Sequence, residues 1–128
     1  MSSLQTVKLE LEGNVPSKKN SRVHTRAGIS IPSQAFRNWQ DSALWQVRRQ
    51  TKARLLRPVA IEVVIYFATL RKSDIDNKLT SILDMLVESL VIRDDKWQYV
   101  PKMSVEARYR KGDPGASIVI RELDDVTL

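Results

Sequence analysis

Apolar and polar residues alternate along residues 6–12, where Val7, Leu9 and Leu11 are separated by charged side chains. This period of two is typical of a strand with one buried face. A second strand is predicted at 59–70, because the run VAIEVVIYFATL is rich in β-branched and aromatic residues. Such a run favours a central strand of a sheet.

Two other segments repeat their apolar residues at helical spacing. The first begins after Ser33, a favoured N-cap residue, and should continue to about residue 56, just before a proline. The second is expected at 77–90, where leucine and isoleucine residues form one apolar stripe. Tryptophans on such helices usually pack inside the protein, so Trp39 and Trp45 are expected in the core or between helices.

Shorter elements complete the pattern. Residues 22–32, RVHTRAGISIP, should form a small hairpin that turns at Ala27-Gly28. The sequence Asp113-Pro114-Gly115 is a strong turn signal between two last strands, expected within 98–110 and at 116–121. The order β-(hairpin)-α-β-α-β-β predicts an α+β fold with a small mixed or antiparallel sheet and two main helices. No repeat or linker divides the chain, which indicates one domain.

The charge balance points to a polyanionic partner. The chain has 21 Lys and Arg against 15 Asp and Glu, a formal net charge of +6. Nucleic acid is the usual partner of so basic a protein, although solubility alone is the simpler explanation. The absence of cysteine and the single His24 exclude disulfides, thiolate zinc sites and histidine clusters. The N-terminus lacks a signal-peptide layout and no apolar run approaches the ~18 residues of a membrane span, so a cytoplasmic protein with no membrane partner is expected.

The segment KSDIDNK, residues 72–78, sets two aspartates one residue apart before the second expected helix. Asp74 is expected at the end of the preceding strand and Asp76 at the helix cap, and side chains two apart in an extended segment face the same side. Both carboxylates would then suit Mg²⁺, which takes oxygen ligands and often only one or two protein carboxylates. The later pair Asp94-Asp95 would supply a third ligand. Taken singly, each aspartate is better explained as a helix cap or a solvated turn, and it is their combination beside basic segments that favours a metal site.

Basic residues flank these aspartates in the sequence. They are the candidates for contacts with nucleic-acid phosphates, which orient a bound strand without reading its sequence. The predicted DNA-binding residues are Lys18, Lys19, Arg22, Arg26, Arg71 and Lys72.

These segments together resemble the RusA-type Holliday junction resolvases. The similarity runs through the basic segment VPSKKNSR, the motif DIDN, an apolar helix containing LD-x-L and the later DD pair, with the spacing from Asp74 to Asp95 ungapped. The resemblance implies one RusA-like endonuclease domain over residues 1–128. It implies a homodimeric, Mg²⁺-dependent endonuclease, with Mn²⁺ as a substitute and no small-molecule cofactor. Such an enzyme resolves four-way DNA junctions in recombination and repair by symmetric cleavage.

Carried over by position, the resemblance implies that Asp74, Asp76 and Asp95 are the catalytic metal ligands. Asp94 and Asp84 match further acidic positions of the family pattern and rank as support rather than direct ligands.

One position departs from the family pattern. The family usually has a lysine four residues after the second aspartate, where this chain has Thr80. Lys78 stands two residues after Asp76, about 200° round a helix, and so does not replace that lysine from the same direction. Its long side chain can still reach a phosphate. Two alternatives therefore stay open for Lys78: a catalytic residue, or a solvated surface lysine. Other cations that would fill the role are Lys72, Lys18, Lys19 and Lys102.

The sequence leaves three alternatives to a junction resolvase open. The first is a catalytically weak or inactive homologue that binds branched DNA, and the second is a Mg²⁺-dependent nuclease for another branched or flapped DNA. The third is a basic RNA-binding module in which the aspartates serve as caps and turns. The RNA-binding alternative predicts binding without metal and no cleavage.

Overall fold

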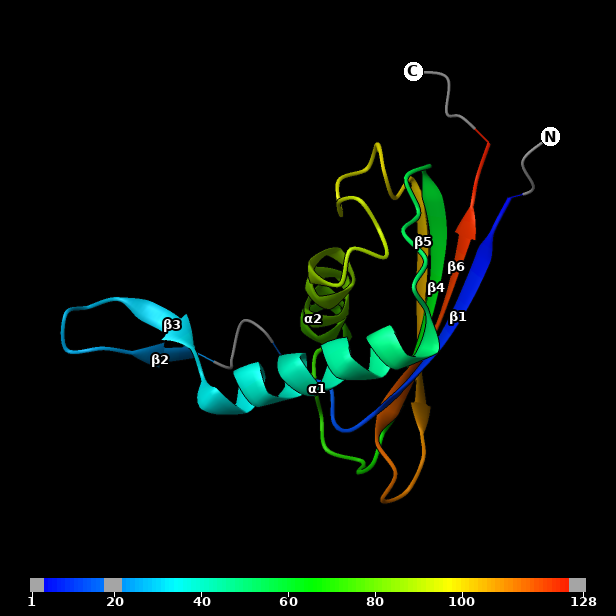
Figure 1. Ribbon diagram of the computed structural model, residues 1–128. Coiled ribbons are helices and arrows are strands. Elements are labelled where there is room, and N and C mark those ends of the chain that lie inside the picture. The colour runs from blue at the N-terminus through cyan, green and yellow to red at the C-terminus, as the bar shows by residue number, and fades with distance from the viewer. Residues whose placement is uncertain (1–3, 18–21, 125–128) are drawn as a thin grey trace.

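Four strands form one mixed sheet, and both helices lie on the same side of it (Figure 1). The computed structural model describes residues 4–17 and 22–124. The α+β class is confirmed, and no helix in the described ranges is long and apolar enough to cross a membrane. In chain order the elements are β1 (Thr6–Glu12), β2 (Arg22–His24), β3 (Ser30–Pro32), α1 (Gln34–Gln50), β4 (Val59–Phe67), α2 (Ile75–Glu88), β5 (Lys102–Tyr109) and β6 (Gly115–Glu122).

The strand order of the sheet is β1-β6-β4-β5. Strand β6 is antiparallel to both of its neighbours, whereas β5 runs parallel to β4. The predicted alternation of β1 is confirmed, because its three apolar residues are buried and the four between and around them are exposed. The core fills the space between the sheet and the helices, with fully buried side chains that include Ile61, Ile65, Ile118, Ile82 and Leu86.

The start of α1 is as predicted. The Oγ of Ser33 accepts the backbone N–H of Phe36 at 3.1 Å, which is the N-cap bond expected from the sequence. Trp39 is buried in the core, as predicted. The prediction for Trp45 was wrong, since its side chain is 59% exposed and lies under the guanidinium of Arg49, 4.6 Å from the ring centroid.

The end of α1 was predicted wrongly. The helix stops at Gln50, six residues before the expected end, and Thr51 adopts an extended backbone. Leu55 is fully buried, and its backbone N–H donates to the carbonyl of Val91 at 2.8 Å. Residues 51–57 therefore leave the helix because an extended segment can bury Leu55 and pair with the chain after α2.

The ends of β4 and α2 also differ from the sequence prediction. Strand β4 ends at Phe67, because its parallel partner β5 ends opposite it at Tyr109. Helix α2 begins at Ile75, two residues earlier than expected, and ends at Glu88. Leu90, which was expected in the apolar stripe, is 52% exposed and has a left-handed φ of 68°.

The predicted hairpin forms as β2 and β3, which project away from the sheet at the start of α1 (Figure 1). The backbone N–H of Thr25 donates to the carbonyl of Ile29 at 2.9 Å and closes the loop. Gly28 has a φ of 78°, which is the left-handed conformation that glycine tolerates best. The hairpin therefore presents its turn to solvent.

Two glutamines of α1 close the outer edge of β1. The side-chain amide of Gln50 donates to the Glu10 carbonyl at 2.6 Å, and its Oε1 accepts the Glu10 N–H at 2.8 Å. Gln46 makes the same pair of bonds with Glu12, at 3.3 and 2.7 Å. Each amide thus replaces the bonds that a neighbouring strand would make, which protects this edge from pairing with another chain.

We predict that the double variant Gln46→Ala, Gln50→Ala unfolds more easily than the natural chain. Four hydrogen bonds to the β1 backbone are lost, and partial replacement by water leaves a cost of about 1–3 kcal/mol. Urea denaturation measures this loss in the free energy of unfolding. The control is Gln34→Ala, whose amide bonds only to side chains of its own helix. An unchanged denaturation midpoint in the double variant would show that the glutamines do not stabilise the edge.

Candidate functional site

The aspartates of KSDIDNK lie at the N-terminus of α2. Asp74 is the N-cap residue, with φ −81° and ψ 121°, and Asp76 lies in the first turn. The sequence prediction misplaced both: Asp74 is seven residues beyond the end of β4 rather than at it, and Asp74 rather than Asp76 holds the cap position. The helix begins early because Ile75 packs against the core and thereby enters the first turn.

Both carboxylates of this acidic pair are exposed. The Oδ2 of Asp74 accepts the side-chain amide of Asn77 at 3.3 Å, and the Oδ1 of Asp76 accepts the backbone N–H of the same asparagine at 2.9 Å. In the described part of the chain neither forms an ion pair. The aligned amides of the helix N-terminus favour negative charge here, and oxygens of both groups remain available to a cation.

Asp95 lies with a second acidic group, beside the C-terminal half of α2. It lines an open pocket of about 280 Å³ with Asp84 and Glu88. Asp84 is eight residues beyond Asp76, which places it about 12 Å further along the helix axis. Among residues 4–17 and 22–124, no three carboxylate or imidazole side chains lie close enough together to hold one metal ion.

Asp94 is held as a turn residue. Its Oδ1 accepts the backbone N–H of Asp95 at 2.7 Å, and its Oδ2 pairs with the ammonium of Lys96 at 3.3 Å. The backbone hydrogen bond lowers the pKa of the Asp94 carboxyl below its usual range, and Lys96 adds to this effect. Asp95 is the more exposed of the two.

Lys78 is buried, with only 6% of its surface exposed, which excludes the alternative of a solvated surface lysine. Its ammonium donates to the carbonyl of Val15 and lies 5.5 Å from the centroid of the Phe67 ring. Burial lowers the pKa of Lys78. The hydroxyl of Ser81, one turn on, donates to the next carbonyl, that of Pro16, at 2.7 Å. Two side chains of α2 therefore hold the segment that follows β1.

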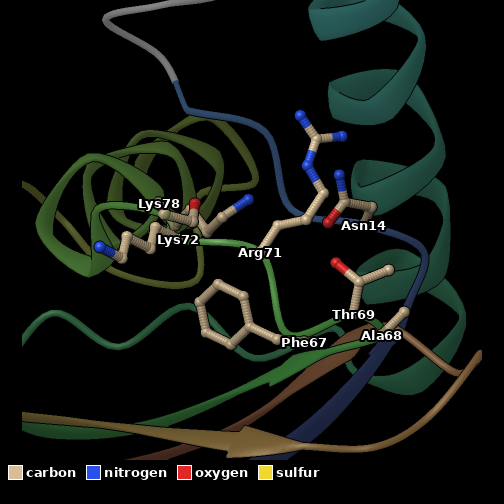
Figure 2. A pocket seen from close by; sticks show the side chains of 8 residues that line it. Asn14, Phe67, Ala68, Thr69, Arg71, Lys72 and Lys78 are labelled. Carbon is tan, nitrogen blue, oxygen red and sulfur yellow. The ribbon is translucent and has the colours of Figure 1, made fainter.

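A basic pocket of about 360 Å³ lies where this segment, the end of β4 and the start of α2 meet (Figure 2). Three cationic side chains, one amide and two hydroxyls line it, and no carboxylate does. Such donors suit an anion, and among the described residues none of the three cations forms an ion pair with a carboxylate. The lining residues are Asn14, Phe67, Ala68, Thr69, Arg71, Lys72, Ser73 and Lys78.

The other predicted DNA-binding residues lie elsewhere. Arg26 is exposed in the turn of the β2–β3 hairpin and does not line the basic pocket. Lys18 and Lys19 lie outside the described residues. Arg22 is the first residue of β2. The structure thus brings Arg71 and Lys72 together with Lys78 and Asn14, and sequence reasoning had not placed Asn14 in any site.

Thr80 is exposed on α2, one turn beyond Asp76. Its hydroxyl donates to the carbonyl of Asp76 at 3.1 Å, a local bond back to the helix backbone. Thr80 and the buried Lys78 therefore point to different sides of α2, in agreement with the helical geometry expected from the sequence.

Comparison with known proteins gives two findings. Residues 12–121 match the protein family described as Endodeoxyribonuclease RusA. A relative from Aquifex aeolicus (strain VF5), named Crossover junction endodeoxyribonuclease RusA, is 25% identical over 122 residues, which cover 94% of this chain and 95% of the relative. The matched range contains the basic pocket and both acidic groups. The chain belongs to the RusA endodeoxyribonuclease family.

Proposed function

We propose that this protein is a Mg²⁺-dependent, structure-specific endodeoxyribonuclease that resolves four-way DNA junctions. The observation that carries the proposal is the exposed pair Asp74 and Asp76, which begins two residues after Lys72. Arg71 and Lys72 line the basic pocket. Hydrolysis of a phosphodiester needs a cation held by carboxylates beside a place for the phosphate. The name of the Aquifex relative favours a crossover junction as the substrate.

Asp74, Asp76 and Asp95 are the proposed metal ligands. The donor chemistry fits, because Mg²⁺ takes oxygen ligands and usually needs one or two protein carboxylates besides water and substrate phosphate. When bound there, Mg²⁺ would activate a water and offset charge on the phosphate. Asp95 is proposed from the family pattern alone, since within one chain it lies with Asp84 and Glu88 rather than with the acidic pair. Asp84 and Asp94 remain supporting residues.

The residues of the chain itself would bind and orient the DNA. Arg71 and Lys72 would hold backbone phosphates beside the acidic pair and offset the charge that grows on the attacked phosphate. Water adds to phosphorus, the bond to the 3′ oxygen breaks, and that oxygen gains a proton. Lys78 is a positioning residue in this proposal, because its buried ammonium anchors the segment that begins the basic VPSKKNSR stretch.

A homodimer is part of the proposal. A four-way junction has approximate two-fold symmetry, and symmetric cleavage requires two equivalent active sites at a fixed separation. A two-fold dimer supplies them from one chain.

One observation favours a second candidate function, a catalytically weak protein that binds branched DNA. The family usually has a lysine where this chain has Thr80, whose hydroxyl bonds only to its own helix. The RNA-binding alternative is less favoured, because the family is one of endodeoxyribonucleases.

We predict that Asp74→Asn, Asp76→Asn and Asp95→Asn each reduce cleavage of a synthetic four-way junction by more than about 100-fold, since even outer partners of a metal cost 10–100-fold. Binding measured with a chelator should be unchanged or tighter, because a negative charge near the DNA is lost. Gel assays of cleavage and binding test both. Asp41→Asn, an exposed aspartate of α1, is the control. Parallel loss of binding and cleavage would contradict the assignment as metal ligands.

We predict that Arg71→Gln with Lys72→Gln weakens junction binding and its salt dependence. Two lost phosphate contacts should lower the slope of log K against log salt by about 2. The matched control is Arg48→Gln with Lys52→Gln, which removes the same two charges from exposed positions near and just beyond the end of α1. Equal effects of the two double variants would mean that the basic pocket is not a phosphate site.

We predict that Thr80→Lys raises the cleavage rate under Mg²⁺ without much change in affinity. A lysine at this exposed position would leave α2 one turn from Asp76, where the threonine is too short to reach a phosphate. Single-turnover cleavage at saturating protein measures the rate, and Thr80→Gln controls for side-chain length without charge. An unchanged rate in Thr80→Lys would show that a missing cation at this edge of α2 is not what limits cleavage.

A further inference from the structure

The β2–β3 hairpin stands apart from the main sheet. In the described ranges it forms a separate two-stranded sheet, and it projects beyond the start of α1 (Figure 1). Both ends of the hairpin are nevertheless anchored. Ser33, directly after β3, caps α1, and two side chains of α2 bond to the carbonyls of Val15 and Pro16 ahead of β2. A two-stranded hairpin is only marginally stable in water, so a partner that covers this one would stabilise it.

One side of the hairpin is apolar. Val23 and Ile31 are direct partners across the two strands and therefore point to the same side. The backbone bond from Thr25 to Ile29 continues the ladder toward the turn, and side chains alternate along β3, which sets Ile29 on that side as well. These three apolar side chains form the hairpin face. They are 48%, 36% and 59% exposed for Val23, Ile31 and Ile29, so the single chain leaves the hairpin face uncovered.

The hairpin face belongs to a strongly cationic segment. Residues 13–40 contain five lysines and arginines and no aspartate or glutamate. Arg26 is exposed in the turn of the hairpin, and among the described residues no carboxylate pairs with it. Apolar side chains among cations fit a partner that offers apolar surfaces between anions. The base pairs and phosphates of DNA have this combination, and DNA-bending proteins insert isoleucine and other apolar side chains between bases.

A branch point is the part of a DNA that suits the hairpin face. A continuous duplex hides the flat faces of its base pairs by stacking them on one another, and an inserted side chain must first separate a stacked step. At an opened branch point the stacking is already interrupted. A two-stranded ribbon is also narrow enough to enter a groove of DNA, so the hairpin can reach the bases there.

The hairpin is tied closely to the candidate site. Asn14 lines the basic pocket, and β2 begins six residues after the anchored Pro16. Six residues span at most about 20 Å. A DNA whose phosphates lie at Arg71 and Lys72 is therefore within reach of the hairpin as well.

We propose that the hairpin face packs against the unstacked base pairs at the branch point of a branched DNA. Val23, Ile29 and Ile31 cover the apolar base faces, and Arg26 contacts a phosphate beside them. The inference rests on the proposed function, because it takes a four-way junction as the ligand. It names the side chains that distinguish a branch from a continuous duplex, which phosphate contacts alone do not do.

Binding by matched variants tests the proposal. Val23→Thr with Ile29→Thr keeps β-branched side chains, which favour strands, and makes the hairpin face polar. With a chelator present, this variant should bind a synthetic four-way junction about ten-fold more weakly than the natural chain, because apolar burial at the branch is lost. Its affinity for a linear duplex should not change.

The matched control is Leu4→Thr with Leu56→Thr, which alters two leucines outside the hairpin that are 45% and 69% exposed. This control should bind both DNAs as the natural chain does, and circular dichroism confirms that all the variants fold. An unchanged affinity of the hairpin variant for the junction overturns the proposal. Equal losses for junction and duplex also overturn it, because the hairpin would then contact any duplex arm.

A fluorescent adenine analogue placed beside the branch point gives the second test, since its emission rises when the base unstacks. At saturating protein the natural chain should raise this emission, and the hairpin variant should raise it much less. The same label within an arm should respond to neither protein. Equal emission with the natural chain and the hairpin variant overturns the proposal.

Sedimentation without DNA tests a different occupant of the hairpin face. The natural chain and the hairpin variant should sediment alike, because the proposal leaves this face free until DNA binds. A smaller particle in the hairpin variant would mean that another protein chain covers the face, and it overturns the proposal.

These measurements separate the hairpin contact from the proposed function. Junction binding that depends on the hairpin face, in a protein that cleaves no DNA under Mg²⁺, leaves the inference standing and rejects the nuclease proposal. Junction binding and cleavage that are both unchanged in the hairpin variant reject the hairpin contact alone.

Discussion

The hydrogen bond between the buried Lys78 ammonium and the Val15 carbonyl is the constraint on which the candidate site depends. A buried ammonium is costly unless it is well paired, and here one carbonyl and the face of Phe67 offset part of that cost. The bond joins the helix that bears the acidic pair to the segment that leads into the basic stretch. Ser81 adds a second bond one turn along the same helix. The relative positions of the acidic and basic parts are therefore set by α2.

Most strands could be predicted from the sequence because their signals are local. The alternation of β1 and the β-branched run of β4 each reflect burial on a sheet. The turn before β6 was predicted at Asp113-Pro114-Gly115 but lies at Lys111-Gly112, where Gly112 has a φ of 68°, and Gly115 already belongs to β6. The ends of the elements could not be predicted so well. Helix α1 stops at Gln50 because Leu55 pairs with the chain after α2, and β4 stops where β5 stops. Such limits come from partners distant in sequence.

The candidate site likewise has a part that local sequence signals predict and a part that depends on contacts between distant residues. The acidic pair is a local motif and was found, whereas the basic pocket depends on a contact between Val15 and Lys78, 63 residues apart. A signal for the burial of Lys78 was nevertheless present. Lys78, Ser81 and Met85 recur at intervals of three and four, and all are buried. These three positions lie beside the apolar stripe on the face of α2 that packs against the protein. A lysine in this row is therefore expected to be buried.

The loop from Ala68 to Asp74 connects the catalytic proposal with the dimer proposal. Its Leu70 lines an open pocket beside β5, and the next two residues, Arg71 and Lys72, line both that pocket and the basic pocket. If the two-fold dimer of the proposed function restricts this loop, Arg71 and Lys72, the proposed phosphate-binding cations, are restricted with it. If dimerisation already orders the loop, DNA binding no longer incurs the conformational-entropy cost of ordering it. Dimerisation would then prepare each site for its phosphate as well as fix the distance between the two sites.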